Sequence, residues 1–221
     1  MWLKVRSTWK YAYQHYLNDY DLFHIGGDDH YLIPENLVYM ASVGSWKGPW
    51  NFSEPLFLGG SMVDFPMTNV RYCGGGSGYT LNRAALKLLV EQLFDTYHCR
   101  PHYQASDEDR IISDCFRSVG VYCMDTNDAK NETRYHQASV NFHANWTRDQ
   151  PAVWHPGPLD RVHGIASKEG LGQISESSVS FHLKGMPKGS QDRGMRRYHA
   201  ILHGLCNGRN LTVANRVPVD G

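Results

Sequence analysis

The chain has 221 residues, of which 41% are hydrophobic, and we expect one domain with one full hydrophobic core over residues 1–221. Its 22 basic and 22 acidic residues give a formal net charge of zero, which argues against a nucleic-acid partner held by bulk electrostatics. No apolar run of about 18 residues is present, so the sequence predicts no membrane-spanning helix in these residues.

Sequons and cysteines carry information about the compartment. Asn-x-Ser/Thr sequons favour a secretory lumen, and they begin at Asn51, Asn131, Asn145 and Asn210. The first residues have no apolar stretch of the kind found in a signal peptide, so we expect the natural protein to start upstream of Met1. The five cysteines leave one unpaired if the other four form disulfides.

The first predicted elements are a helix and a strand. Aromatic residues from Trp9 to Tyr20 recur at helical spacing and predict a helix, with Ser7 or Thr8 as its N-cap. A strand is expected at 22–25, where an apolar run ends in two glycines.

Pro34 then stands at a favourable first position for the next helix. The segment "EPLFLGG" (54–60) indicates a strand that runs into a turn. The glycine-dense segment "VRYCGGGSGYTL" (70–81) has β-type residues on both sides of its glycines. Asn82 is expected to cap a helix that reaches about Tyr97.

In the second half, Asp107 is the predicted cap of another helix. Its apolar stripe is expected to comprise Ile111, Ile112, Cys115, Phe116 and Val119. Strands are expected at 119–125 and 177–183, and a last helix at 193–205, whereas 127–170 has no regular pattern. The alternation of strands and helices indicates an α/β fold.

Two adjacent carboxylates, Asp28 and Asp29, follow the first predicted strand. In open α/β sheets, ligands bind beyond the carboxyl ends of the strands. Paired carboxylates at such an edge suit a hard divalent cation such as Mg²⁺ or Mn²⁺, which removes their mutual repulsion. The alternative is an Asp-Asp turn in solvent.

The glycine-rich run comprises Gly74, Gly75, Gly76, Ser77 and Gly78. Glycines allow close backbone approach to a ligand, and successive free N–H groups can hold an anion or sugar hydroxyls. The run lacks the P-loop lysine and the dinucleotide spacing, so neither nucleotide motif applies. The alternative is a tight strand-to-helix connection.

Two further candidates lie later in the chain. Glu108 and Asp109 fall in the first turn of a predicted helix, where a carboxylate can act as a general base, or can simply stabilise the helix dipole. His182 ends a predicted strand and is a candidate metal ligand, although a structural role is the alternative.

Four segments taken together resemble a known family. They are "YQHYLNDYDLFHIGGDDHYLIPENL", "RYCGGGSGYTLNRAAL", "SDEDRIISDCF" and "SSVSFH". In order and rough spacing they resemble the inverting β1,3-glycosyltransferases that include core 1 β1,3-galactosyltransferase and the Fringe proteins. The core 1 branch is the most similar.

The resemblance implies a GT-A type fold that binds Mn²⁺ and a UDP-sugar. It implies Asp29 and His182 as the metal ligands, Asp28 near the ribose or donor sugar, and the run from Gly75 to Gly78 near the donor. It places the general base best at Asp109, with Glu108 second.

The resemblance also implies a disulfide between Cys99 and Cys115, since cysteines at this separation flank the same segment in the core 1 branch. Cys73, Cys123 and Cys206 have no such partner by spacing, and at least one of them is expected to be free.

The activity implied is transfer of galactose from UDP-galactose to N-acetylgalactosamine on glycoproteins, in the Golgi lumen. The family has an N-terminal half with uridine-binding strands and a type II membrane anchor, and both are expected to be absent from this chain. The first acidic position of the family is Gly27 here. Three alternatives therefore stay open: a non-catalytic glycan-binding or chaperone-like member, an inactive fragment or degraded copy, and an unrelated metal-dependent hydrolase.

Overall fold

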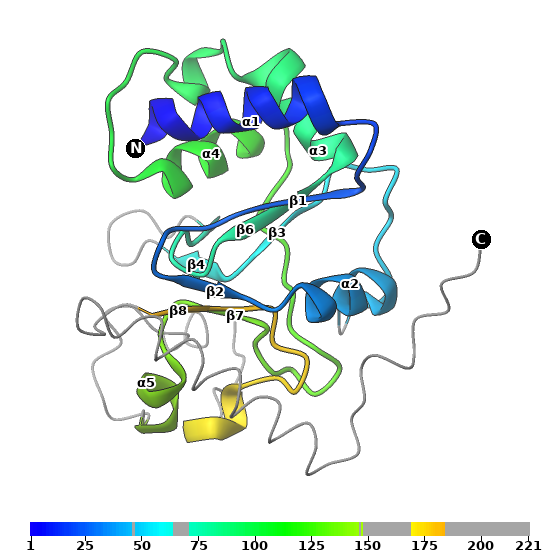
Figure 1. Cartoon of the computed structure of the whole chain (residues 1–221), viewed down its shortest axis with the longest axis vertical. Coiled ribbons are helices and arrows are strands. Elements are labelled where there is room, and N and C mark those ends of the chain that lie inside the picture. The colour runs from blue at the N-terminus through cyan, green and yellow to red at the C-terminus, as the bar shows by residue number, and fades with distance from the viewer. Residues whose placement is uncertain (46, 64–70, 146, 148–168, 184–221) are drawn as a thin grey trace.

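The computed structural model describes residues 1–45, 47–63, 71–145, 147 and 169–183 (Figure 1). The helix expected at 193–205 lies outside these residues, as do Cys206 and Asn210. Within them, no helix is both long enough and apolar enough to cross a membrane.

One antiparallel sheet has the strand order β1-β6-β3. Its strands are β1 (Leu22–Ile25), β3 (Phe57–Gly59) and β6 (Tyr79–Asn82). Figure 1 shows three helices on one face of this sheet, namely α1 (Trp2–Tyr16), α3 (Arg83–Leu88) and α4 (Glu108–Arg117). A π-helical turn (Leu89–Leu93) continues α3, and a 3-10 turn (Tyr97–Cys99) follows it.

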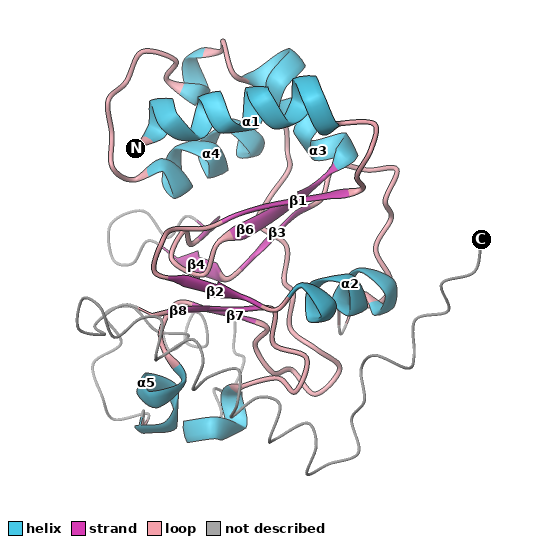
Figure 2. Cartoon of the chain, viewed as in Figure 1, coloured by secondary structure: helices cyan, strands magenta, loops and turns pink. Residues whose placement is uncertain are grey.

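A second sheet lies on the other side of the first, with the order β2-β8-β7 (Figure 2). Its strands are β2 (His30–Leu32), β7 (Tyr135–His136) and β8 (Ser180–His182). β2 and β8 are antiparallel, whereas β7 and β8 are parallel. The remaining elements are α2 (Pro34–Val43), the β4–β5 pair (Ser61–Val63 and Arg71–Cys73), α5 (Val140–Asn145) and a 3-10 turn (Gly170–Gln173).

The main core fills the space between the three helices and the first sheet. Its largest buried side chains include Trp2, Trp9, Phe57, Phe94 and Phe116. Burial of such aromatic rings stabilises a fold by roughly 2–3 kcal/mol each before the entropic cost of ordering them. This core therefore fixes the helix layer on the sheet, and with it the start of α4.

The first helix begins earlier than predicted. Ser7 and Thr8 are not N-caps, since their hydroxyls lie inside α1 and donate to the carbonyls of Leu3 and Lys4 at 3.0 Å. Trp2 extends the buried face of α1 toward the N-terminus. A helix that started at Ser7 would not include this residue.

The cap at Asn82 is confirmed. Its Oδ1 accepts the N–H of Ala85 at 2.9 Å and also the N–H of Leu56 at 2.9 Å, so one side chain starts α3 and pins a neighbouring loop. The α-helical hydrogen bonding ends at Leu88, which is earlier than the predicted end near Tyr97.

Two predictions around α4 are wrong. Val119 is 48% exposed because α4 ends at Arg117, so it does not continue the apolar stripe. The described segment 119–125 forms no strand and makes only one bridge, from Met124 to Leu58, because the positive φ of Gly120 (79°) turns the chain there.

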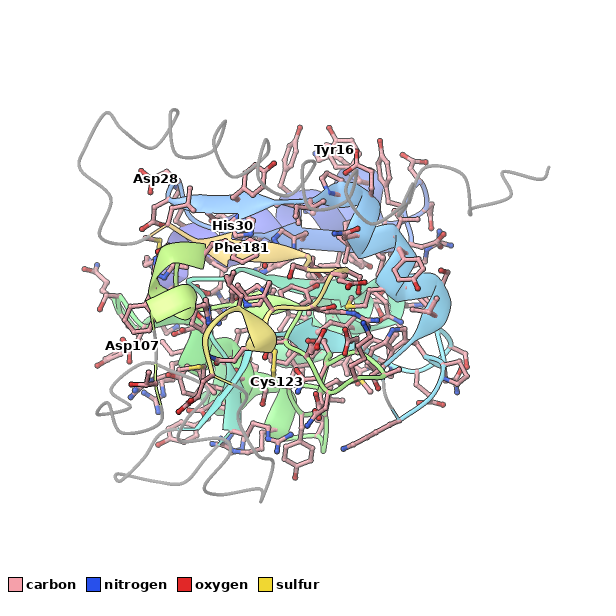
Figure 3. The ribbon with its side chains drawn as sticks, turned by 90° about the horizontal axis from the view of Figure 1, so that it is seen from below. Tyr16, Asp28, His30, Asp107, Cys123 and Phe181 are labelled. Atoms are coloured by element: carbon pink, nitrogen blue, oxygen red, sulfur yellow. A yellow bond between two sulfur atoms is a disulfide. The ribbon has the colours of Figure 1, made fainter. Side chains whose placement is uncertain are left out.

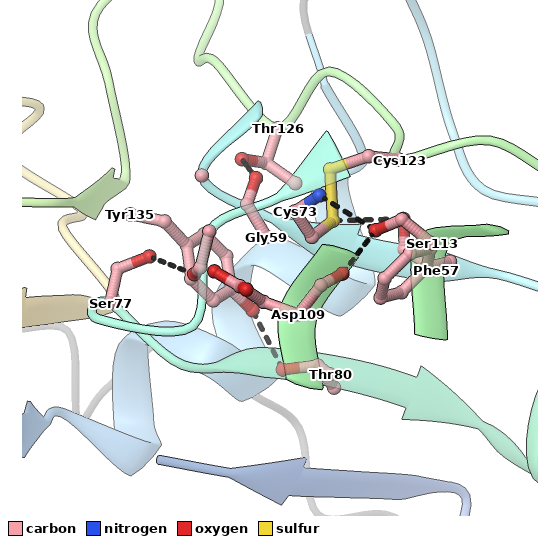
Figure 4. Close-up of a disulfide and its surroundings, with 12 residues drawn as sticks. Phe57, Gly59, Cys73, Ser77, Thr80, Asp109, Ser113, Cys123, Thr126 and Tyr135 are labelled. Carbon is pink, nitrogen blue, oxygen red and sulfur yellow. Dashed lines mark hydrogen bonds between the residues drawn. A yellow bond between two sulfur atoms is a disulfide. The ribbon is translucent and has the colours of Figure 1, made fainter. Parts of the chain in front are cut away.

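Two disulfides are present among the described residues. Cys99–Cys115 is present as expected, with its Cα atoms 4.8 Å apart, and it joins the turn after α3 to α4. Cys73–Cys123 was not expected from the spacing of the cysteines, and that interpretation is wrong for these two residues (Figure 4). They are 50 positions apart, and only the return of the chain past β5 brings them together. The expectation that at least one of Cys73, Cys123 and Cys206 is free then rests on Cys206, which lies outside the described residues.

Candidate functional site

Asp29 and His182 meet through strand pairing. Asp29 directly precedes β2, and β2 pairs antiparallel with β8 so that His30 lies opposite His182. The N–H of Leu183 donates to the Asp29 carbonyl at 2.7 Å, which extends the pairing by one step. As a result, Asp29 Oδ2 and His182 Nε2 are 3.1 Å apart, although 153 positions separate them in the chain.

The meeting does not arise at the edge of one open sheet, where the sequence placed Asp28 and Asp29. Asp28 and Asp29 lie in the turn between β1 and β2, and these two strands belong to different sheets. The start of one strand and the end of its antiparallel neighbour therefore bring the two side chains together, rather than two carboxyl ends at one edge of a parallel sheet.

The hydrogen bonding of His182 shows what its ring can bind. Nδ1 lies 3.2 Å from the carbonyl oxygen of Gln137, and since a carbonyl can only accept, Nδ1 carries the proton. In a neutral ring, Nε2 is then an acceptor that faces the carboxylate of Asp29. Two acceptors at this distance need a proton or a cation between them.

The 3.1 Å between these two atoms is the length of a direct hydrogen bond between a protonated imidazole and a carboxylate. It is also close to the separation of about 3 Å between adjacent ligands of an octahedral cation with bonds of about 2.1 Å. The side chains of Asp29 and His182 are 33% and 15% exposed, so the pair is accessible. The described residues contain no group of three or more His, Cys, Asp and Glu arranged to hold a metal ion.

Asp28 and Gly27 adjoin this pair. Asp28 is exposed, and Figure 3 places it toward the same end of the molecule as Asp107, the residue before α4. A Cβ at Gly27 would lie 3.0 Å from Asp29 Oδ1, which is tighter than ordinary contact. Glycine at the family's first acidic position therefore leaves room for the carboxylate of Asp29.

Most N–H groups of the glycine-rich run already have partners, so the expected row of free donors is wrong. The N–H of Gly75 donates to Asp109 Oδ2 at 2.8 Å, and that of Ser77 donates to Gln137 Oε1 at 3.2 Å. Gly74 and Gly78 donate to backbone carbonyls at 2.9 Å. Among the described residues, the N–H of Gly76 has no acceptor.

The run lies between the Asp29–His182 pair and the carboxylates of α4. A Cβ at Gly76 would overlap Nδ1 of His182, and a Cβ at Gly75 would lie 2.7 Å from Glu108 Oε1. Glycine is needed at both positions because each backbone touches a candidate side chain. The structure thus brings all four predicted segments together.

Glu108 and Asp109 both face this run from the first turn of α4. Glu108 Oε2 accepts the hydroxyl of Tyr79 at 2.8 Å, and Asp109 Oδ1 accepts the N–H of Arg110 at 2.9 Å. Ser113 anchors the turn, since its hydroxyl donates to the Asp109 carbonyl at 2.7 Å and accepts the N–H of Cys73 (Figure 4). Asp107 is in the N-cap position, but its side chain makes no capping hydrogen bond.

Burial changes the acidity of both carboxyls. It raises the pKa of Glu108 to about 7, with the charge of Asp109 adding to the effect and the Tyr79 hydrogen bond opposing it. Burial also raises the pKa of Asp109, against the hydrogen bonds from Gly75 and Arg110. A carboxylate with a raised pKa is a better proton acceptor at neutral pH.

Sequence reasoning missed a buried chain of polar groups next to this site. His24 Nε2 is 3.1 Å from His30 Nε2, and its Nδ1 is 2.8 Å from the hydroxyl of Thr80, which contacts the hydroxyl of Tyr135 at 2.8 Å. Burial lowers the pKa of His24 to about 3, so the ring is neutral at physiological pH. The chain of contacts fixes the ring of His30, whose neighbours are Asp29 and His182.

Sequence reasoning also missed Gln137. It follows β7 directly, in a segment where the sequence shows no regular pattern, so no sequence signal marked it.

A hollow of about 620 Å³ lies away from these residues, and its lining includes Trp50, Arg71 and Tyr122. None of the predicted site residues lines it, so the candidate site rests on the convergence of side chains.

No family model matches the chain, and the known proteins that are similar to it include two enzymes. A glycoprotein-N-acetylgalactosamine 3-beta-galactosyltransferase 1 of Xenopus laevis is 28% identical over 204 residues, which cover 92% of this chain and 52% of that protein. A human chondroitin sulfate glucuronyltransferase is 30% identical over 125 residues, which cover 56% of this chain and 15% of that protein. The chain thus spans about half the length of the first relative and a smaller part of the second. The longer match supports a relationship to β1,3-galactosyltransferases.

Proposed function

We propose that this chain contributes the catalytic centre of a metal-dependent inverting β1,3-glycosyltransferase with a GT-A fold. The proposed reaction is transfer of galactose from UDP-galactose to N-acetylgalactosamine on a glycoprotein. The observation that carries the proposal is the contact of Asp29 with His182, since a carboxylate oxygen and an imidazole nitrogen converge across the glycine-rich run from two partly buried carboxylates. The relatives support a glycosyltransferase, and donor and acceptor belong to the proposal.

Asp29 and His182 would hold the Mn²⁺ ion. The Nδ1–H bond to the carbonyl of Gln137 orients His182, as is usual for histidine ligands. When bound, the ion offsets the negative charge that develops on the departing UDP. Two protein ligands leave room in the coordination shell for oxygens of a diphosphate.

The general base removes a proton from the acceptor hydroxyl, which then attacks the anomeric carbon in line with the leaving group and inverts it. Asp109 is the first candidate, since the N–H of Gly75 and the N–H of Arg110 hold one oxygen each and fix the carboxylate at the run. Glu108 is second, and its pKa of about 7 suits proton transfer at neutral pH. The donor contacts in this proposal come from the exposed Asp28 and from the N–H of Gly76, which has no acceptor among the described residues.

The test is hydrolysis and transfer of a panel of UDP-sugars by this chain, and by any longer protein that contains it, with and without Mn²⁺. We expect Mn²⁺-dependent turnover of UDP-galactose that is lost in Asp29→Asn and kept in Asp19→Asn, an exposed carboxylate outside the site. Turnover that survives Asp29→Asn, or that is the same without a divalent cation, would contradict the proposal.

A non-catalytic glycan-binding role is the second candidate, and Gly27 favours it because one acidic group of the family motif is missing. That role predicts binding of a glycan with no UDP-sugar hydrolysis at any cation concentration.

We also propose the Golgi lumen as the compartment, with a type II anchor in the full-length protein. The exposed positions of Asn51 and Asn131, each in a sequon, support exposure to the glycosylation machinery of the secretory pathway.

A further inference from the structure

The amide of Gln137 is bonded on both sides to the glycine-rich run. Its Nε2 donates to the Gly74 carbonyl at 3.0 Å and to the Ser77 hydroxyl at 2.6 Å. Its Oε1 accepts the N–H of Ser77 at 3.2 Å. Both N–H donors and the oxygen of this amide are therefore used on one loop.

The backbone of the same residue is bonded to His182. The Gln137 carbonyl accepts from Nδ1 of the histidine ring at 3.2 Å. One residue thus contacts the run through its side chain and His182 through its main chain. Since β7 pairs with β8 immediately before Gln137, the sheet fixes where this carbonyl lies.

The glycines around Gln137 fit the shape of its amide. A Cβ at Gly60 would lie 2.6 Å from Nε2, and a Cβ at Gly74 would lie 2.5 Å from the same atom. Real Cβ atoms do not approach so closely, so both glycines leave space for the glutamine. This accounts for two glycines that no turn geometry requires, since neither has a positive φ.

We propose that Gln137 is a positioning residue of the site. Its amide binds Ser77 and Gly74. These contacts fix the position of Gly75 and Gly76 between the α4 carboxylates and His182. Its carbonyl holds His182 in the Nδ1–H tautomer, so that Nε2 presents its lone pair toward Asp29. The functional meaning of this role rests on the proposed metal-dependent transferase.

The test compares Gln137→Met with the parent protein. Methionine has nearly the same volume but no hydrogen-bonding amide, so it removes the side-chain contacts to the run with little change in packing. The backbone carbonyl that accepts from His182 remains in the variant, so the comparison asks whether the amide holds that carbonyl in place. Gln137→Glu is the second variant, because it keeps an oxygen for the Ser77 N–H and loses the two donors. Ser139→Ala is the control, since Ser139 lies two positions further on and its hydroxyl bonds only locally, to the N–H of Phe142.

The primary readout is the ¹H and ¹⁵N chemical shift of the Nδ1–H group of His182, which reports its hydrogen bond to the Gln137 carbonyl without any metal. We expect a hydrogen-bonded Nδ1–H in the parent and in Ser139→Ala, and a weaker hydrogen bond with a shifted Nδ1–H signal in Gln137→Met and Gln137→Glu. Unchanged Nδ1–H shifts in both Gln137 variants would overturn the proposal. Loss of the folded state in both would also overturn it, because Gln137 would then be a structural residue.

The second readout is the dissociation constant for Mn²⁺, from the EPR signal of the free ion. Removal of groups that orient a ligand typically weakens metal binding about 10–100-fold, and we expect a loss in this range for both Gln137 variants and none for Ser139→Ala. If the parent protein binds no Mn²⁺, the proposed function fails. The measurement on the Nδ1–H group of His182 still decides the role of Gln137.

Discussion

Glu108→Gln should change how the stability of the protein depends on pH. In the folded chain, burial and the neighbouring charge of Asp109 raise the pKa of Glu108 from 4.5 to about 7. The amide in the variant stays neutral at every pH, and its carbonyl oxygen can still accept the hydroxyl of Tyr79. The comparison therefore isolates the ionisation of one buried carboxyl.

The sign follows from proton binding. Between pH 4.5 and 7 the folded state holds a proton on Glu108 that the unfolded state has lost, so this contribution to stability is complete below 4.5 and disappears as pH rises through 7. A shift of this size corresponds to on the order of 3 kcal/mol. The free energy of unfolding of the parent should fall by about that amount relative to the variant between pH 4.5 and 8.

Urea unfolding followed by tryptophan fluorescence measures this difference at each pH, with the disulfides intact. His24, whose pKa of about 3 gives the opposite slope, is present in both proteins and cancels. Glu91→Gln is the matched control, since Glu91 also accepts a tyrosine hydroxyl, from Tyr13 at 2.6 Å, but does so at the exposed surface. Parallel curves for the parent and Glu108→Gln would refute the inference that Glu108 is buried beside a second charge.

Three further results are expected. Asp109→Asn should lower the initial rate of transfer by about 10²–10⁴-fold, the usual value of a general base, and a larger loss in Glu108→Gln would exchange the two roles. Replacement of both members of a disulfide by serine should lower the free energy of unfolding in urea by about 4 kcal/mol for Cys73–Cys123, which closes the longer loop, and by about 3 kcal/mol for Cys99–Cys115. Equal losses would show that loop length does not govern the effect. Protein secreted from eukaryotic cells should carry N-glycans at Asn51 and Asn131, and unmodified peptides at both sites after mass mapping would argue against the secretory pathway.

Local signals in the sequence were reliable where a short-range interaction decides the structure. The strand at Leu22–Ile25 and the helix start at Pro34 were predicted at the residues observed. Asn82 was predicted as a cap because its side chain reaches an N–H only three positions away. The same reasoning failed at Ser7, since the buried face that begins at Trp2 determines the helix start there.

Contacts between distant segments were harder to predict. The meeting of Asp29 with His182 was expected from a family resemblance, yet the antiparallel pairing of β2 with β8 that produces it was not. The Cys73–Cys123 disulfide and the contacts of Gln137 depend on how loops return to the sheet. The spacing of residues along the chain does not predict the path of these loops. The number of free N–H groups in the glycine-rich run was overestimated, because a sequence does not show which acceptors surround a loop.

Binding of Mn²⁺ to the folded chain tests the metal site most directly. A titration followed by the EPR signal of the free ion, with UDP present, should give about one bound ion per chain in the parent protein. Asp29→Asn and His182→Ala should each lose this binding while the urea midpoint stays close to that of the parent, because both side chains are partly exposed. A parent protein that binds no Mn²⁺, or variants that bind it as tightly as the parent, would contradict the assignment of Asp29 and His182 as its ligands.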